Sequence, residues 1–209
     1  IFAICGKSVS SAERNIVMPF QTIDNLPYTI DYRRSDRLMN VTCGKRSNLF
    51  YIFGGKDESS YALIQGITLS GVLLDEVALM PKSFVDQALA RTLSVENAKI
   101  WFTCNPESPE HWFHTDYILG QQPGIKRLHF LMEDNPIMTP EKIKRAEQMF
   151  SGVFYQRYVL GLWVRAEGVI FRQFADDSEG WLIDNELNPD TIKQIAYITF
   201  GVDFGESTS

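Results

Sequence analysis

The stretch Val72-Leu73-Leu74-Asp75-Glu76 is a short apolar run that ends in two adjacent acidic residues. Uninterrupted apolar runs of this length are typical of strands that are buried on both faces of a parallel sheet. In open α/β sheets, ligands bind at the carboxyl ends of the strands, which is where Asp75 and Glu76 stand. The stretch therefore favours an α/β fold with a ligand site, although a strand followed by an acidic helix start produces the same pattern.

Two adjacent acids after a buried strand also suit a nucleotide hydrolase of the Walker type. In such enzymes the first acid holds a magnesium ion and the second polarises the attacking water. On this hypothesis Asp75 is the metal ligand and Glu76 is the catalytic residue. Acidic pairs after apolar triplets also occur by chance, so the rest of the chain has to support the hypothesis.

Composition and charge are those of an ordinary soluble globular protein. The chain has 209 residues, 44% of them hydrophobic and 22% charged, which allows one sizeable core or one domain with part of another. No apolar run approaches the roughly 18 residues of a membrane span, so we expect no membrane association. A net charge of −6 argues against a protein that coats nucleic acid, but local basic clusters leave room for a local contact with DNA.

The cysteines and histidines favour neither a disulfide framework nor a zinc site. Cys5, Cys43 and Cys104 are odd in number and far apart, which favours a reducing compartment such as the cytoplasm. Cys104 with His111 and His114 could suggest a metal cluster, but a fourth ligand at a plausible spacing is missing. We expect these aromatic-rich residues to be packing residues.

Gly6-Lys7-Ser8 matches only the end of a phosphate-binding loop. That loop needs a glycine five positions earlier, and position 1 is Ile. Phe2-Ala3-Ile4 has the character of a strand, and Ser10–Met18 has that of a helix. The sequence therefore predicts a strand that ends at Cys5, with no phosphate-binding loop in this chain.

Strands and helices alternate along the chain. Strands are predicted at Ile1–Cys5, Asn48–Phe53, Val72–Leu74, Lys99–Thr103, Lys126–Leu131 and Ile195–Val202. Helices are predicted at Ser10–Met18, Pro81–Leu93, Thr139–Gly152 and Val153–Leu160, whereas Tyr28–Asn40 is polar and carries no strand prediction. The alternation between residues 67 and 131 predicts a mostly parallel sheet with helices on both faces.

A second polar strand end, Thr103-Cys104-Asn105-Pro106, is predicted at the same edge of the sheet as the two acids. A polar residue at the tip of a neighbouring strand can sense the γ-phosphate and relay hydrolysis to the loop that follows. An Asn-Pro turn that merely ends a strand is the alternative interpretation. The two polar strand ends together support a nucleotide site more strongly than either does alone.

With these features together, the chain resembles the large subunit of the tailed-phage terminase, the motor that pumps DNA into empty capsids. The resemblance covers nearly the whole chain, and its segments follow the order of that family. They are Phe2–Lys7 with Arg14-Asn15, Phe53–Glu58, Gln65–Thr68, Asp75-Glu76 with Leu79–Pro81, Thr103–Pro106, Asp134–Pro136, Gly152–Tyr158 with Gly161–Trp163, and Gly201–Asp203.

The resemblance implies a RecA-like, additional-strand ATPase fold followed by the first strands of a ribonuclease H-like nuclease. It places the ATPase core at residues 1–131, a helical linker subdomain at 132–167 and the start of the nuclease at 168–209. The phosphate-binding loop of this family would lie just before Ile1, and the other nuclease acids would lie after Ser209. We therefore expect the chain to be a fragment of a longer protein.

The resemblance also implies roles for single residues, cofactors and partners. Asp75 and Glu76 match the Walker B pair, Thr103–Asn105 (with Cys104 between them) match the coupling motif, and Asp203 matches the first metal-binding acid of the nuclease. The implied cofactors are ATP with Mg²⁺, and Mg²⁺ or Mn²⁺ at the nuclease. The implied partners are double-stranded DNA, the portal protein and the small terminase subunit, with several copies of the chain in a ring.

Two other functions remain open on the sequence alone. A superfamily helicase would also use Asp75-Glu76 as its acidic box, although helicases usually follow that pair with Ala and His or Asp, and Val77-Ala78 stands here. A scaffold or DNA-binding fragment with purely structural acids is the non-enzymatic alternative. Asp203-Phe204-Gly205 resembles the magnesium motif of protein kinases, but no His-Arg-Asp catalytic loop precedes it.

Overall fold

The chain divides into two units, Ile1–Arg165 and Ala166–Ser209. A computed structural model describes residues 1–120 and 122–165, which belong to the first unit. The predicted strand Ile195–Val202 and the predicted nuclease residue Asp203 lie outside the described residues. The assignment of residues 168–209 to a nuclease therefore stays a prediction.

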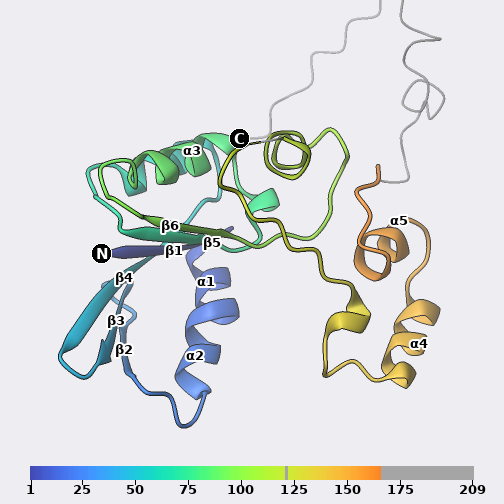
Figure 1. Cartoon of the computed structure of the whole chain (residues 1–209), viewed down its shortest axis with the longest axis horizontal. Coiled ribbons are helices and arrows are strands. Elements are labelled where there is room, and N and C mark those ends of the chain that lie inside the picture. Colours follow the sequence, from blue (N-terminus) through green and yellow to red (C-terminus); the bar gives the residue numbers. More distant parts are fainter. Residues whose placement is uncertain (121, 166–209) are drawn as a thin grey trace, which may run out of the picture. The chain divides into compact units, whose positions relative to one another are not determined.

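A six-stranded mixed sheet forms the centre of the described unit (Figure 1). Its strand order is β2-β3-β4-β1-β5-β6. β1 pairs in parallel with β4 and β5, and β6 pairs in parallel with β5, whereas β2, β3 and β4 pair antiparallel. The predicted parallel arrangement of the first strand, the acid-bearing strand and the Ile100 strand is confirmed. The strands are β1 (Phe2–Gly6), β2 (Thr29–Arg33), β3 (Leu38–Cys43), β4 (Arg46–Gly54), β5 (Gly71–Leu74) and β6 (Lys99–Phe102).

Helices cover both faces of this sheet, as predicted. The continuous run α1–η1–α2 lies on one face and α3 lies on the other (Figure 1). Within the described residues, no helix is long and apolar enough to cross a membrane. The helices are α1 (Val9–Ala12), η1 (Glu13–Val17), α2 (Met18–Thr22), η2 (Glu58–Ile64), η3 (Val77–Leu79), α3 (Lys82–Ala90), η4 (His114–Leu119), η5 (Met132–Asp134), α4 (Pro140–Met149), α5 (Gly152–Phe154) and η6 (Tyr155–Val159).

The central strands are apolar without interruption because both of their faces are buried. Successive side chains of a strand point to opposite faces of the sheet. In β1, Ala3 and Cys5 join the core under α3, while Ile4 joins the core under α1 and η1. In β5, Leu74 belongs to the α3 side and Leu73 packs on the opposite side. This two-sided burial fixes the register of the strands whose ends form the site.

Local polar contacts decide where the helices next to the strand ends begin. The Ser8 hydroxyl accepts a hydrogen bond from the Ser11 backbone N–H (3.1 Å), and the Ser11 hydroxyl accepts one from the Ser8 backbone N–H (2.9 Å). This reciprocal pair is a capping box, and it starts α1 directly after β1. A Cβ atom on Gly54 would lie 2.8 Å from the Val9 backbone nitrogen, so only glycine allows β4 to end beside α1.

The structure corrects two predictions. Residues 126–131 form no strand, and Leu128 and Phe130 are exposed there. The segment is held by a side-chain contact, in which the Arg127 Nε donates a hydrogen bond to the Tyr117 carbonyl (2.6 Å). Conversely, the polar stretch Tyr28–Asn40 contains β2 and the start of β3. Its alternating burial was concealed by polar side chains on the exposed face.

Candidate functional site

The carboxyl ends of four parallel strands meet at one edge of the sheet. In the register of the sheet, Gly6 is paired with Gly54, Cys5 with Leu74, and Leu74 with Phe102. The two acids that follow β5 therefore stand beside the end of β1 on one side and beside the threonine that follows β6 on the other. The prediction that both polar strand ends lie at the same edge is confirmed.

Asp75 is held from two sides by side chains of other elements. It is buried, with 8% of its surface exposed, and its backbone N–H donates to the Cys5 carbonyl (2.8 Å). The Thr103 hydroxyl donates to Asp75 Oδ1 (2.8 Å), and Asn15 Nδ2 donates to Asp75 Oδ2 (3.0 Å). Each carboxylate oxygen thus has one protein donor, which fixes the orientation of the group and satisfies a buried charge.

Glu76 occupies a sharp turn directly after Asp75. Its backbone has φ 55° and ψ 50°, which is the left-handed region that non-glycine residues seldom adopt. The Glu76 N–H donates to the Thr103 hydroxyl (3.0 Å), and η3 starts at the next residue. Such local strain is concentrated at functional sites. The half-buried Glu76 carboxylate makes no hydrogen bond or ion pair with the described residues, so it is available to a water molecule.

Thr103 contacts both acids through a single hydroxyl group. Its backbone N–H donates to the Leu74 carbonyl (3.0 Å), and its carbonyl accepts from the Val77 N–H (2.9 Å). A change in the position of β6 would therefore alter the hydrogen bonds of both Asp75 and Glu76.

The other two residues of the predicted coupling motif are not part of this network. Cys104 packs against the core under α3, and burial raises the pKa of its thiol to about 11, so the thiol stays protonated at neutral pH. The Asn105 side chain is exposed and has no hydrogen-bond partner among the described residues. Their role in coupling stays a prediction.

The oxygen ligands at this edge of the sheet suit a magnesium ion. Within the described residues, no three His, Cys, Asp or Glu side chains gather into a metal-binding group. Magnesium does not need such a group, because it is usually bound by one or two carboxylates together with substrate phosphates and water. The Asp75 carboxylate accepts two hydrogen bonds and has about four lone-pair sites, so oxygen lone pairs remain for a metal or its water.

The Gly6-Lys7-Ser8 segment does not form a phosphate-binding loop. The residues before it form β1, and Ser8 is occupied in capping α1. The Lys7 Nζ donates to the Lys56 carbonyl (2.7 Å). The prediction that a strand occupies the place of such a loop is confirmed.

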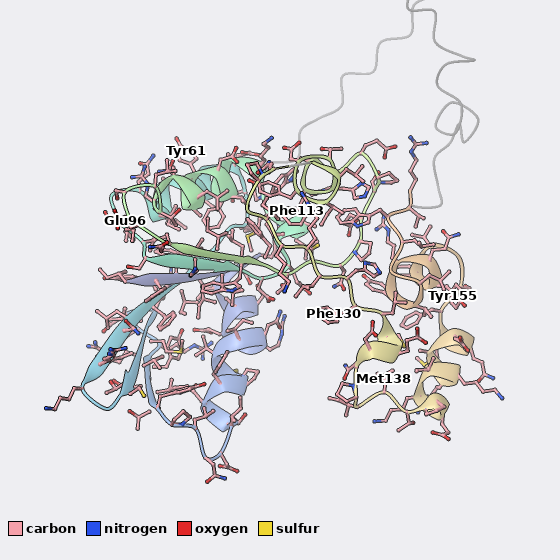
Figure 2. The ribbon with its side chains drawn as sticks, viewed as in Figure 1. Tyr61, Glu96, Phe113, Phe130, Met138 and Tyr155 are labelled. Atoms are coloured by element: carbon pink, nitrogen blue, oxygen red, sulfur yellow. The ribbon has the colours of Figure 1, made fainter. Side chains whose placement is uncertain are left out.

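His111 and His114 are packing residues, as predicted. The His114 ring stacks on Trp163 with 4.4 Å between the ring centroids, and its Nδ1 lies 2.8 Å from the Pro109 carbonyl. Burial lowers the pKa of His111, so this ring is neutral at neutral pH. Phe113, labelled in Figure 2, lies beside them in the core under α3.

Sequence reasoning missed the role of η1 in the site. Asn15 belongs to a segment that resembles the terminase family, but no function followed from that likeness. Glu13, in the same helical segment, is only 6% exposed although it is charged. A charged residue between Ala12 and Val17 on the buried face of a helix was the signal that could have drawn attention to this segment.

An apolar cavity on the sheet is a separate feature. It measures about 480 Å³ and lies on the sheet face that α2 covers. Phe20, Ile30, Leu73, Trp101 and Thr103 are among its lining residues. Apolar walls of this kind cannot offset the charge of phosphate groups. The polar strand ends are therefore the better candidate for nucleotide chemistry.

Comparisons with known proteins agree with this geometry. Residues 3–175 match the family model of the terminase large subunit, T4likevirus-type, N-terminal. The chain is 32% identical over 91 residues to the large terminase subunits of Thermus phage G20c and Thermus virus P23-45, which covers 44% of this chain and 18% of each relative.

Solved structures agree as well. The large terminase of a thermophilic bacteriophage, in complex with ADP, is 44% identical, with a TM-score of 0.76 over 85% of this chain and 44% of that chain. Another crystal form of the same terminase is 47% identical, with a TM-score of 0.75 over 84% of this chain and 44% of that chain. The ATPase domain of the large terminase of Thermus phage P74-26 is 16% identical, with a TM-score of 0.53 over 78% of this chain and 76% of that chain, and shares the fold.

The matched region covers less than half of the length of the thermophilic bacteriophage terminase and about a fifth of the length of the Thermus phage subunits. The comparisons favour the terminase interpretation over the helicase and scaffold alternatives, and they confirm the α/β, RecA-like fold of the described unit. The match of the family model extends over most of the chain. The chain belongs to the terminase large subunit family.

Proposed function

We propose that this chain carries one part of the ATP-hydrolysing site of a motor that packages viral double-stranded DNA into capsids. The observation that carries the proposal is the contact of Asp75, at the end of β5, with Thr103, at the end of the neighbouring β6. Structures of the thermophilic bacteriophage terminase contain ADP in one case and ATP-γ-S in another, which supports nucleotide binding in this family. A phosphate-binding loop outside this chain would complete the site.

Asp75 and Glu76 have different roles in this proposal. Asp75 would hold Mg²⁺, which would offset the negative charge on the phosphates. Glu76 orients the attacking water and accepts its proton, because its carboxylate has no competing partner among the described residues. The Asp75 carboxylate cannot serve as that base in the same way, since both of its oxygens already accept protein hydrogen bonds.

In the proposal, Thr103 couples the site to the end of the described unit. A few residues after it, the Glu107 carboxylate accepts from Arg157 Nη1 (2.6 Å), and the Glu107 carbonyl accepts from the Val164 N–H (3.1 Å). A shift of Thr103 after phosphate release would therefore act on residues close to Arg165, where the first unit ends. In the proposal, this connection couples ATP hydrolysis to DNA movement.

The remaining parts of the proposal concern the whole protein. Several copies of the full-length protein would form a ring in the host cytoplasm and contact the portal protein, the small terminase subunit and double-stranded DNA. Asp203 would be the first metal-binding acid of a Mg²⁺- or Mn²⁺-dependent nuclease that cuts the concatemeric genome. Membership of the terminase large subunit family supports the packaging part. The nuclease part rests on the resemblance of Gly201–Asp203, which follow the matched residues 3–175.

The central experiment exchanges each acid in the full-length protein. Glu76→Gln should keep ATP binding and lose hydrolysis by roughly 10²–10⁴-fold, because an amide cannot accept the proton of the water. Asp75→Ala should instead weaken the Mg²⁺-dependent part of nucleotide binding. A DNA-stimulated ATPase assay with a parallel binding titration separates the two effects. Parental hydrolysis by both variants would show that other acids do the chemistry.

Two further measurements delimit the proposal. The 209-residue chain by itself should show no appreciable ATPase activity, because it lacks a lysine-bearing phosphate-binding loop. Robust turnover would instead assign phosphate binding to Gly6-Lys7-Ser8. In the full-length protein, Asp203→Ala should abolish metal-dependent plasmid cutting and leave ATP hydrolysis intact. Unchanged cutting would remove Asp203 from the nuclease site.

A further inference from the structure

We propose that Asn15 is the positioning residue that holds Asp75 in its metal-binding orientation, an inference that rests on the proposed ATPase function. Asn15 lies in η1, on the helical layer beside β1 and not on a strand end. Its Nδ2 donates to Asp75 Oδ2 at 3.0 Å. The site therefore includes a side chain from a third element, in addition to the ends of β5 and β6.

The two donors to Asp75 act as a pair. Thr103 binds Oδ1 from β6, and Asn15 binds Oδ2 from η1. Rotation of the carboxylate away from this position would break at least one hydrogen bond to a buried charge, and such bonds are among the stronger ones in proteins. Without Asn15, the carboxylate would keep one tether and could turn about it.

The chemical nature of Asn15 suits this role. An amide donates a hydrogen bond without carrying a charge, so it orients Asp75 and leaves the negative charge of the carboxylate available to Mg²⁺. A lysine or arginine at this position would neutralise the carboxylate and compete with the metal. A carboxylate would repel Asp75 and would offer no donor at neutral pH.

The position of Asn15 is itself fixed from the opposite side of η1. Glu13, two residues earlier, is buried and accepts a hydrogen bond from the Tyr32 hydroxyl (2.5 Å). Its other oxygen lies 3.1 Å from Arg34 Nη2. Both partners belong to β2 or the turn after it. The hairpin of β2 and β3 therefore anchors the helical segment that carries Asn15. This segment, η1, is π-helical, and π-helical turns recur at functional sites.

The test compares Asn15→Leu, which keeps the approximate shape but removes the donor, with Gln21→Leu, which removes an exposed amide of α2. Both are made in the full-length protein, and the binding of a fluorescent ATP analogue is titrated with Mg²⁺ and, separately, in EDTA. Asn15→Leu should raise the Mg²⁺ concentration for half-maximal binding about tenfold, the effect of one hydrogen bond to a charged group. Binding in EDTA should stay at the parental level, and Gln21→Leu should change neither.

A double variant tests whether Asn15 acts through Asp75. Asp75→Asn should itself raise the Mg²⁺ requirement, and adding Asn15→Leu in that background should raise it no further. Asn15→Gln, which keeps the amide on a longer side chain, should recover part of the loss. If Asn15→Leu does not fold, Asn15→Ser takes its place, because a serine hydroxyl is too short to reach Asp75 and the same loss is expected.

The outcomes distinguish this inference from the proposed function. Equal weakening of binding in Mg²⁺ and in EDTA, or a Mg²⁺ requirement unchanged by Asn15→Leu while Asp75→Asn raises it, would overturn the positioning role of Asn15 alone. A parental protein with no Mg²⁺-dependent nucleotide binding, or an unaffected Asp75→Asn variant, would overturn the proposed function, and the inference with it.

Discussion

The parallel half of the sheet (β1, β5 and β6) and its antiparallel half (β2 and β3) differ in how their side chains are buried. In the parallel half, β1 and β5 are buried on both faces, and Ala3, Val72 and Leu74 are at most 1% exposed. In the antiparallel half, β2 alternates between exposed and half-buried residues along its whole length. The first half is buried on both faces, whereas the second packs apolar side chains such as Met39 and Ile30 on one face only and adds a few polar anchors.

The difference matters because the two halves contribute to the site in different ways. The parallel half supplies the reacting groups at its strand ends, Asp75, Glu76 and Thr103. The antiparallel half supplies none of them, but Tyr32 and Arg34 bind Glu13 and thereby fix the helical segment next to Asp75. Each half can therefore be disturbed separately, and the sizes of the effects should differ.

The largest expected effect is a loss of core packing in the parallel half. Leu74→Ala should lower the free energy of unfolding by about 2–5 kcal/mol, because Leu74 is fully buried and its removal leaves a cavity. The same exchange in the hairpin, Leu38→Ala, should cost about 1 kcal/mol, since Leu38 is only half-buried. Urea unfolding of both variants measures the difference. Equal losses would mean that the two halves share one continuous core.

An intermediate effect is expected at Thr103. Thr103→Val keeps the shape but leaves the buried Asp75 Oδ1 and the Glu76 N–H without their partner, which should cost about 1–3 kcal/mol of stability. Thr42→Val in the hairpin is the matched control and should change stability by less than about 0.5 kcal/mol. Thr103→Ser should stay near the parental value. A Thr103→Val variant as stable as the control would show that water replaces the hydroxyl.

The smallest effect is expected from the polar anchor of the hairpin. Tyr32→Phe should cost about 1 kcal/mol near neutral pH, because Arg34 remains bound to the other oxygen of Glu13. In the parental protein, burial and the hydrogen bond to Glu13 raise the pKa of Tyr32 to about 12 from the ordinary 10.0.

The sign of that pKa shift defines a pH window. The folded pKa lies above the unfolded one, so the stabilisation by Tyr32 is complete below about pH 10 and is lost as the pH rises towards 12. The difference in unfolding free energy between the parental protein and Tyr32→Phe should therefore shrink between these values. A difference that is constant from about pH 8 to about pH 12 would contradict the hydrogen bond between Tyr32 and Glu13.

The parallel half could be predicted from the sequence because its signal is local. Val72–Leu74 is apolar without interruption, and its two acids follow at once, so the strand and its functional end are both visible in one short stretch. Thr139 and Pro140 likewise predict the start of α4, which the structure confirms with a hydrogen bond from the Lys142 N–H to the Thr139 hydroxyl (3.4 Å). Such signals depend only on residues that are neighbours in the chain, so they can be recognised without knowledge of the tertiary structure.

The sequence did not reveal the β2–β3 hairpin and wrongly predicted a strand at residues 126–131, and both errors have the same physical cause. A strand is defined by its partner, and the partner is not visible in the segment itself. Residues 29–33 are largely polar but become a strand because β3 pairs with them. Residues 126–131 carry apolar and β-compatible side chains but have no strand beside them within the described unit, so Leu128 and Phe130 stay exposed.

By itself, the sequence determined the mostly parallel α/β sheet, the two acids at the end of β5 and the threonine at the end of β6, because hydrophobic pattern and strand ends are local properties of the chain. Its RecA-like character followed only from the resemblance to the terminase family. Only the tertiary structure decided what orients those acids. Asn15 and Asp75 meet although they are 60 positions apart in the chain, and Glu13 and Tyr32 meet although they are 19 apart. Long-range hydrogen bonds between polar side chains leave no periodic trace in a sequence, since they depend on how separate elements pack and not on the order of residues within one of them.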